Sequence, residues 1–181
     1  MKIVGLMLVK SRSSRLPSKN TYPFKGKVMF LHNLQKCLKI FDEVYVSSES
    51  EDILDLADAV GGIAIKRPKE LCGSTPNILV YKHALPFMGD IDGFVAVQAN
   101  SPTIKSVIIR NCKEALEEYK EVMTKHLDGS IYGSVWAMTT KKLAEYTEPY
   151  DYFNPTPEKM FLDESVDIHT EKDLQKALEQ I

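Results

Sequence analysis

Positive charge is concentrated near the start of the chain. Between residues 10 and 27 there are six cationic side chains and no acidic one, namely Lys10, Arg12, Arg15, Lys19, Lys25 and Lys27. Such a cluster is typical either of a solvated face or of a site that binds an anion such as a phosphate. A nucleic-acid groove is disfavoured, because the rest of the chain is acidic enough to bring the net charge to −2.

The cationic stretch follows an apolar run, Ile3–Val9, which predicts a strand buried on both faces. Turn-forming residues dominate 11–20, so this stretch is predicted as a loop. Backbone N–H groups near Ser13 and Ser14 can bond the oxygens of a triphosphate there, while its charge is neutralised by Lys10, Arg15 and Lys19. The Walker A and GxGxxG patterns are absent. A basic surface turn is the alternative interpretation.

Apolar spacing along the chain predicts strands that alternate with helices. The predicted strands are 3–9, 44–46, 63–65, 94–98 and 130–138. The predicted helices are 28–41, 51–60, 78–85, 107–119 and a last one that Thr170 caps with Asp173. This alternation predicts an α/β three-layer sandwich with a mostly parallel open sheet. Ligands bind such sheets at the carboxyl ends of the strands, where four loops gather: 10–20, 47–50, 66–77 and 98–101.

Composition excludes several classes of protein. The chain has 181 residues, 44% hydrophobic and 27% charged, which suits one folded domain over 1–181 rather than a disordered segment. No apolar run reaches the length of a membrane helix, so no membrane partner is expected. The three cysteines include no CxxC pair, which disfavours a disulfide framework or a zinc site. We expect a cytoplasmic protein without nucleic-acid partners.

Six motifs carry a resemblance to a known family. The stretch 13–19, SSRLPSK, resembles the SSRLPGK loop of 3-deoxy-manno-octulosonate and spore-coat polysaccharide cytidylyltransferases, and 17–20 resembles the PxKN of acylneuraminate cytidylyltransferases. Four further stretches are similar to FDxVxVSTDS, RPxEL, QPTSP and SVDIDTxxDL, namely 41–50, 67–71, 98–102 and 165–174. On these motifs, in the family's order, the chain is identified as a member of the CMP-sugar synthetase (acylneuraminate cytidylyltransferase) family.

The resemblance implies a Rossmann-like nucleotidyltransferase fold and a CMP transfer. A hydroxyl of an acidic sugar, sialic-acid-like or a related 2-keto sugar, would attack the α-phosphorus of CTP, and pyrophosphate would leave with the help of Mg²⁺. The catalytic residues it implies are Lys10, Lys19 and Asp167. The nucleotide-binding residues predicted from the loop and the resemblance are Lys10, Ser13, Ser14, Arg15, Lys19, Asn20, Arg67 and Asn77. The acceptor-binding residues are Gln98, Asn100 and Ser101, and the metal ligands are Asp167 and His169.

Three positions depart from the family's pattern. Lys10 replaces an arginine, which keeps the charge but loses the bidentate fork. Asn100 stands where relatives carry Thr or Asp. His169 stands where they carry a second aspartate, and imidazole is a poor ligand for Mg²⁺. Since residues two apart in an extended segment point to one side, Asp167 and His169 are expected to face the cleft together.

Two alternative functions remain open from the sequence. One is a nucleotidyltransferase for another base or for a sugar or polyol phosphate. The other is a nucleotide-binding homologue with reduced catalysis, which the three departures suggest. Residues 125–160 are predicted to form a small sugar-binding or dimerisation segment, and a homodimer is therefore among the expected partners, together with CTP and a sugar acceptor.

Overall fold

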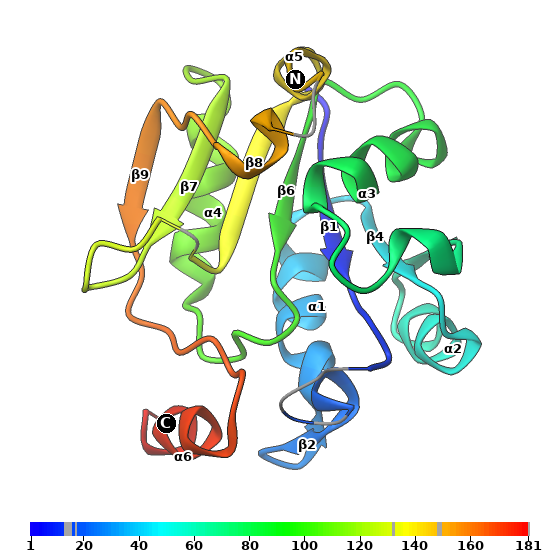
Figure 1. Cartoon of the computed structure of the whole chain (residues 1–181), viewed down its shortest axis with the longest axis vertical. Helices are drawn as coiled ribbons and strands as arrows, with labels where there is room; N and C mark the ends of the chain where they lie inside the picture. Colours follow the sequence, from blue (N-terminus) through cyan, green and yellow to red (C-terminus); the bar gives the residue numbers. More distant parts are fainter. Residues whose placement is uncertain (13–15, 17, 132, 148–149, 181) are drawn as a thin grey trace.

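A seven-stranded sheet organises the chain (Figure 1), and the computed structural model describes residues 1–12, 16, 18–131, 133–147 and 150–180. The strand order is β5–β4–β1–β6–β8–β7–β9, and only β8 runs antiparallel to its neighbours. The strands are β1 Ile3–Leu8, β4 Val44–Ser48, β5 Ile63–Lys66, β6 Gly93–Val97, β7 Glu121–Lys125, β8 Val135–Thr139 and β9 Lys159–Leu162. The predicted mostly parallel sheet is therefore confirmed.

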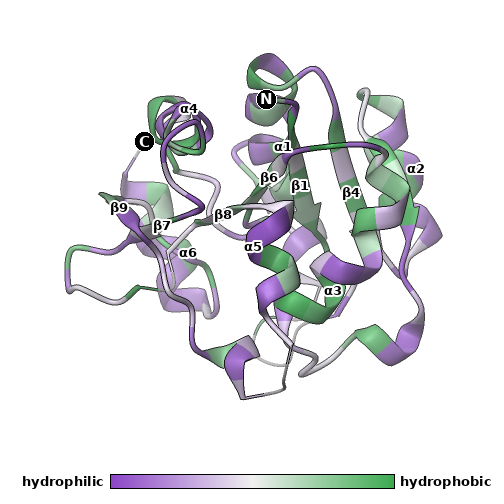
Figure 2. Ribbon diagram, turned by 90° about the horizontal axis from the view of Figure 1, so that it is seen from above, coloured by the Kyte–Doolittle hydropathy of each residue, from purple (hydrophilic) through white to green (hydrophobic). Residues whose placement is uncertain are grey.

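Helices cover both faces of the sheet, as predicted for a three-layer α/β sandwich. On one face, side chains of α1 Met29–Ile40, α2 Glu51–Ala59 and α4 Ser106–Ala115 share a core with the strands. On the other, α3 Asn77–Ala84 and α5 Thr140–Glu145 pack with the 3₁₀ turn Leu85–Met88. Figure 2 shows hydrophobic residues gathered on the central strands between these two layers.

A third, smaller core lies beyond the end of the sheet. It joins the last helix, α6 Glu171–Glu179, to the hairpin of β2 Pro23–Phe24 and β3 Lys27–Val28 (Figure 1). Thr170 and Asp173 form the reciprocal capping box at the start of α6, which confirms the predicted cap. This packing fixes residues 165–169 beside the loop that follows β1.

The region after α4 differs from the sequence prediction. The helix predicted over 107–119 ends at Ala115, and β7 and β9 form where no strand was predicted. The strand predicted over 130–138 begins only at Val135. The polar members of β7 hid its pattern: Thr124 is buried, and its hydroxyl accepts the Val135 N–H at 3.0 Å. Only the folded sheet supplies such partners.

Two side chains of α1 hold the loop that follows β6. The buried Asn33 amide donates to the carbonyls of Gln98 and Ser101, both at 2.8 Å. Lys36 donates to the carbonyls of Pro102 and Ile104, both at 2.7 Å. Burial lowers the pKa of Lys36 to about 8. These bonds fix the shape of a loop that carries three predicted site residues, Gln98, Asn100 and Ser101.

We expect Lys36→Ala to destabilise the protein by about 1–3 kcal/mol, because it removes the donor from two carbonyls that the loop encloses. Urea unfolding followed by circular dichroism measures this loss. The control is Lys39→Ala in the same helix, whose side chain is exposed and whose loss should change stability by less than about 0.5 kcal/mol. Equal effects of the two substitutions would show that Lys36 does not hold the loop.

Candidate active site

A pocket of about 410 Å³ lies at the carboxyl ends of β1 and β6. It takes its lining from three of the four predicted loops, including Lys10, Arg67 and Gln98. A wider basin of about 1110 Å³ shares Lys10 and Lys19 with the pocket and adds Glu49 from the fourth loop. The parallel sheet therefore brings together segments that are far apart in the sequence, at the edge where such sheets bind ligands.

Lys10 and Lys19 bring two positive charges to this pocket. Lys10 lies two residues after the end of β1, and its ammonium donates to the Gly73 carbonyl at 3.3 Å. Lys19 begins a 3₁₀ turn after Ser18, whose φ of 54° reverses the chain. The Lys19 ammonium lies 3.4 Å from His169 Nδ1. Three further residues of the predicted triphosphate loop lie outside the described residues: Ser13, Ser14 and Arg15.

Asn20 places a buried amide on the pocket wall. Its side-chain N–H donates to the Lys10 carbonyl at 3.0 Å, which fixes the orientation of the amide. The other amide atom, Oδ1, is buried and has no hydrogen-bond donor among the described residues. A buried acceptor without a donor carries a free-energy cost that an N–H group of a ligand would remove.

Arg67 is only 2% exposed, yet it lines the pocket. Its guanidinium donates to the Ser47 hydroxyl at 3.1 Å and to the Ser47 carbonyl at 2.7 Å. These bonds hold the planar group in one orientation beside β4. Asn77, the first residue of α3, also lines the pocket.

The three residues predicted to bind the acceptor differ in their placement. Gln98 lines the pocket and donates to the Gly133 carbonyl at 2.9 Å. Asn100 also lines it, but its amide donates to the Ile168 carbonyl at 3.1 Å. Ser101 is fully buried, does not line the pocket, and donates its hydroxyl to Asp167. Ser101 thus positions Asp167, and its predicted contact with the acceptor stays a prediction.

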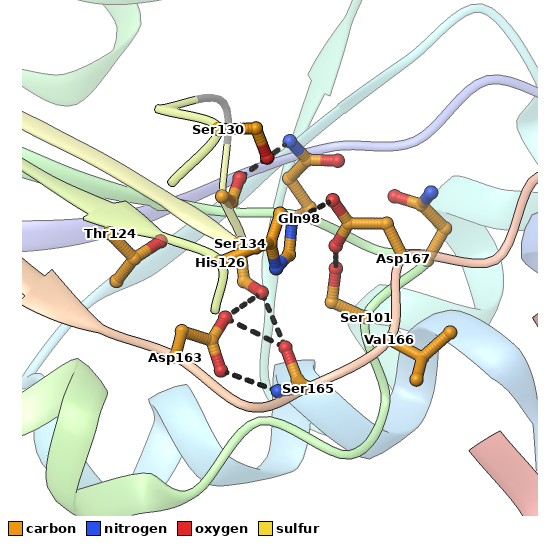
Figure 3. A network of polar contacts seen from close by, with 12 residues as sticks. Gln98, Ser101, Thr124, His126, Ser130, Ser134, Asp163, Ser165, Val166 and Asp167 are labelled. Atoms are coloured by element: carbon orange, nitrogen blue, oxygen red, sulfur yellow. Dashed lines mark hydrogen bonds and ion pairs between the residues drawn. The ribbon is translucent and has the colours of Figure 1, made fainter. Parts of the chain in front are cut away.

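Both carboxylate oxygens of Asp167 are hydrogen-bonded (Figure 3). Oδ1 accepts the Ser101 hydroxyl, and Oδ2 lies 2.8 Å from His126 Nε2. Burial disfavours the charged imidazole, but the Asp167 carboxylate outweighs it and raises the pKa of His126. His126 follows β7, and no motif of the sequence singled it out. Only the pairing of the strands could have revealed its contact with Asp167.

A second buried carboxylate supports this arrangement from below. Asp163 is 2% exposed and accepts bonds from the hydroxyls of Ser134 and Ser165 (Figure 3). It also accepts the Ser165 N–H at 2.9 Å. This network ties the start of β8 to the segment that leads to Asp167.

The structure corrects the prediction that Asp167 and His169 face the cleft together. His169 lines the pocket beside Lys19, whereas Asp167 turns toward Ser101 and His126 and is not among the lining residues. The alternation rule fails because 163–168 is not a strand. The path of this backbone is set by Ile168. Its side chain is fully buried, and its N–H donates to the Asn100 carbonyl at 2.8 Å.

The two predicted metal ligands differ in how they suit a cation. Among the described residues, no three His, Cys, Asp or Glu side chains converge on one point. Asp167 offers the carboxylate that Mg²⁺ commonly takes together with water and substrate phosphates, but both of its oxygens are hydrogen-bonded and it does not line the pocket, so an ion there would replace the His126 contact at Oδ2. His169 suits this ion less well, because imidazole is a poor ligand for Mg²⁺ and Nδ1 lies 3.4 Å from the Lys19 ammonium.

The β8 side of the pocket is aromatic, and β6 separates β8 from β1, the strand that leads to Lys10. This aromatic end consists of Tyr81, Trp136, Tyr152 and Phe153. The ring centroids of Trp136 and Tyr81 lie 5.7 Å apart in an edge-to-face arrangement. The pocket therefore has one end suited to anions and another suited to the flat face of a ligand.

A sequence model of the cytidylyltransferase family matches residues 4–176. The chain belongs to this family. It is 29% identical over 129 residues to the N-acylneuraminate cytidylyltransferase of Escherichia coli O18:K1:H7, a match that covers 68% of this chain and 31% of the relative. It is 28% identical over 118 residues to the 3-deoxy-manno-octulosonate cytidylyltransferase of Yersinia pseudotuberculosis serotype O:1b. This match covers 64% of this chain and 46% of the relative. The chain thus spans about a third to a half of the length of these relatives.

Solved structures share its fold. A CMP:2-keto-3-deoxy-manno-octonic acid synthetase complexed with CTP superposes with a TM-score of 0.80 at 14% identity, covering 99% of this chain and 98% of the other. A protein of Mycobacterium tuberculosis H37Rv, solved as a complex with manganese, superposes with a TM-score of 0.74 at 14% identity. The match covers 100% of both chains. The predicted family and nucleotidyltransferase fold are confirmed. In the described part of the chain, no helix is long and apolar enough to cross a membrane.

Proposed function

We propose that this cytidylyltransferase transfers CMP from CTP to a hydroxyl of an acidic sugar, sialic-acid-like or a related 2-keto sugar. The hydroxyl oxygen bonds to the α-phosphorus, the bond from that phosphorus to the bridging oxygen breaks, and pyrophosphate leaves. The hydroxyl proton passes to solvent. The observation that supports this best is the convergence of Lys10, Lys19, Asn20 and Arg67 on the lining of one pocket, together with an Asn20 amide oxygen that has no hydrogen-bond donor among the described residues.

The cationic end of the pocket takes the triphosphate. Lys10 and Lys19 neutralise the phosphate oxygens, and Lys19 stabilises the charge that develops on the leaving pyrophosphate. In phosphoryl transfer most of the rate comes from such positioning and neutralisation, because the protein performs little covalent chemistry itself. His169, beside Lys19, is placed to donate to the same phosphates.

The nucleoside lies against Asn20 and Arg67. Cytosine carries an exocyclic amine, which can donate to the buried Asn20 oxygen. This bond would remove the free-energy cost of a buried acceptor without a donor. Arg67 is held rigidly by Ser47, so it can bond the nucleotide without a further loss of side-chain freedom. Asn77 borders the same region.

The acceptor lies at the aromatic end of the pocket, beside Gln98. The 125–160 segment contributes Trp136, Tyr152 and Phe153 to this wall, which agrees with a role in sugar binding. Its role in a homodimer stays a prediction.

A divalent cation accompanies the nucleotide, and Mg²⁺ is our proposal. One structural neighbour is a manganese complex. Asp167 would hold the ion together with the phosphate oxygens, and the ion would supply further neutralisation of the triphosphate. Ser101 orients this carboxylate through its hydroxyl.

The proposal is tested by pyrophosphate release with CTP, UTP, GTP and ATP in the presence of Mg²⁺. The acceptors are N-acetylneuraminate, 3-deoxy-manno-octulosonate, a sugar phosphate and a polyol phosphate. We expect release with CTP and one of the two acidic sugars. Release with another base or with a phosphate acceptor would favour the first alternative function. Calorimetric binding of CTP without release on any acceptor would favour a homologue with reduced catalysis.

A further inference from the structure

One buried carboxylate has no part in the proposed reaction. Glu121, the first residue of β7, is fully buried, and a carboxylate so enclosed requires hydrogen bonds and a counter-charge. It accepts bonds from Trp136 Nε1 at 2.7 Å, from the Tyr146 hydroxyl at 2.6 and 2.8 Å, and from Thr156 Oγ1 at 3.3 Å. The Lys142 ammonium, 3.7 Å from Oε2, supplies the counter-charge.

The three donors belong to the parts of the chain that build the aromatic end of the pocket. Trp136 is itself one of the lining residues. Tyr146 and Thr156 flank the stretch that carries the lining residues Tyr152 and Phe153. The Thr156 N–H also donates to the Tyr146 hydroxyl at 3.2 Å. Both flanks of this stretch therefore meet at one carboxylate.

We propose that Glu121 is a positioning residue for the acceptor: it fixes the aromatic end of the pocket without touching the substrate. This inference rests on the proposed function for the identity of the ligand at that end. Lys10 and Arg67 follow β1 and β5, whereas Trp136 belongs to β8, which β6 separates from β1. A change at Glu121 should therefore weaken acceptor binding and leave nucleotide binding intact.

The variant that tests this is Glu121→Gln, which keeps the shape of the side chain but removes its charge and turns one acceptor into a donor. We expect the KM of the reactive acidic sugar to rise by about tenfold or more, since hydrogen bonds to a charged group are lost. The KM of CTP should change by less than about twofold. A merely structural role would lower the melting temperature without separating the two KM values.

A second readout does not depend on turnover. Trp136 is the only tryptophan of the chain, and it is 8% exposed. We expect Glu121→Gln to shift its fluorescence emission and to increase its quenching by acrylamide, while calorimetric affinity for CTP is unchanged. If no acceptor reacts with the wild-type protein, the proposed function fails, and this readout still tests whether Glu121 positions the wall.

The matched control is Glu145→Gln. Glu145 is exposed and contacts the same Lys142 ammonium at 3.3 Å, so the control removes a charge beside the cluster without breaking it. Tyr146→Phe serves as a second variant in case Glu121→Gln does not fold, and it should reproduce the separation of the two KM values. Unchanged acceptor KM and Trp136 quenching, or equal losses for CTP and acceptor, would overturn the proposal.

Discussion

Replacement of Lys19 by alanine should reduce kcat/KM for CTP by more than about tenfold. The Lys19 ammonium lies on the pocket wall, where a triphosphate would place several negative oxygens. A hydrogen bond to a charged group contributes about 1.5–3 kcal/mol, which corresponds to roughly a 10- to 150-fold change. Steady-state pyrophosphate release and calorimetric CTP binding measure the loss.

The control for Lys19 comes from the same cationic stretch. Lys25 is exposed and lies on the β2–β3 turn, outside the pocket, so Lys25→Ala removes the same charge from the same region. We expect this variant to retain CTP binding within about twofold, because exposed charges are screened by solvent and salt. Equal losses of CTP binding in both variants would show that the cationic stretch acts only through its overall charge. No loss in either variant would show that it is a basic surface turn without a role in CTP binding.

Asp167→Asn should lower metal-dependent turnover by on the order of 10²-fold or more, the effect expected when one preorganised charge is removed from a transition state. The amide oxygen can still accept the Ser101 hydroxyl in a side chain of the same shape, but the negative charge is lost and the second oxygen becomes an NH₂ group that cannot bind a cation. The rate at saturating CTP, measured against Mg²⁺ concentration, checks this. Additional Mg²⁺ should not restore the wild-type rate.

Two further variants locate the metal more sharply. Asp128→Asn removes an exposed carboxylate near His126 and should leave the Mg²⁺ dependence unchanged. His169→Ala should also leave the half-maximal Mg²⁺ concentration unchanged, because His169 lies beside Lys19 and not beside Asp167. If His169→Ala raises that concentration while Asp167→Asn has no effect, the metal site lies at His169 and our assignment is wrong.

The sequence alone determined those features that depend on local patterns. The apolar run 3–9 predicts a buried strand because a strand covered on both faces needs no polar alternation, and β1 is buried along nearly all its length. The capping box at Thr170 needs only residues three apart, so its pattern was visible before folding. The motif order placed Lys10, Arg67 and Gln98 after three of the parallel strands, whose carboxyl ends must meet at one edge.

The tertiary structure alone decided which side chains pair around the site. His126 and Asp167 are 41 residues apart, and Ser101 and Asp167 are 66 apart, so no local spacing could join them. No sequence pattern singled out Glu121, which only the folded sheet brings beside Trp136 and its other donors. Hydrogen bonds are short and directional, so their partners are fixed only when packing has set the positions of the elements that carry them. Local pattern therefore predicted the loops, and packing decided the contacts.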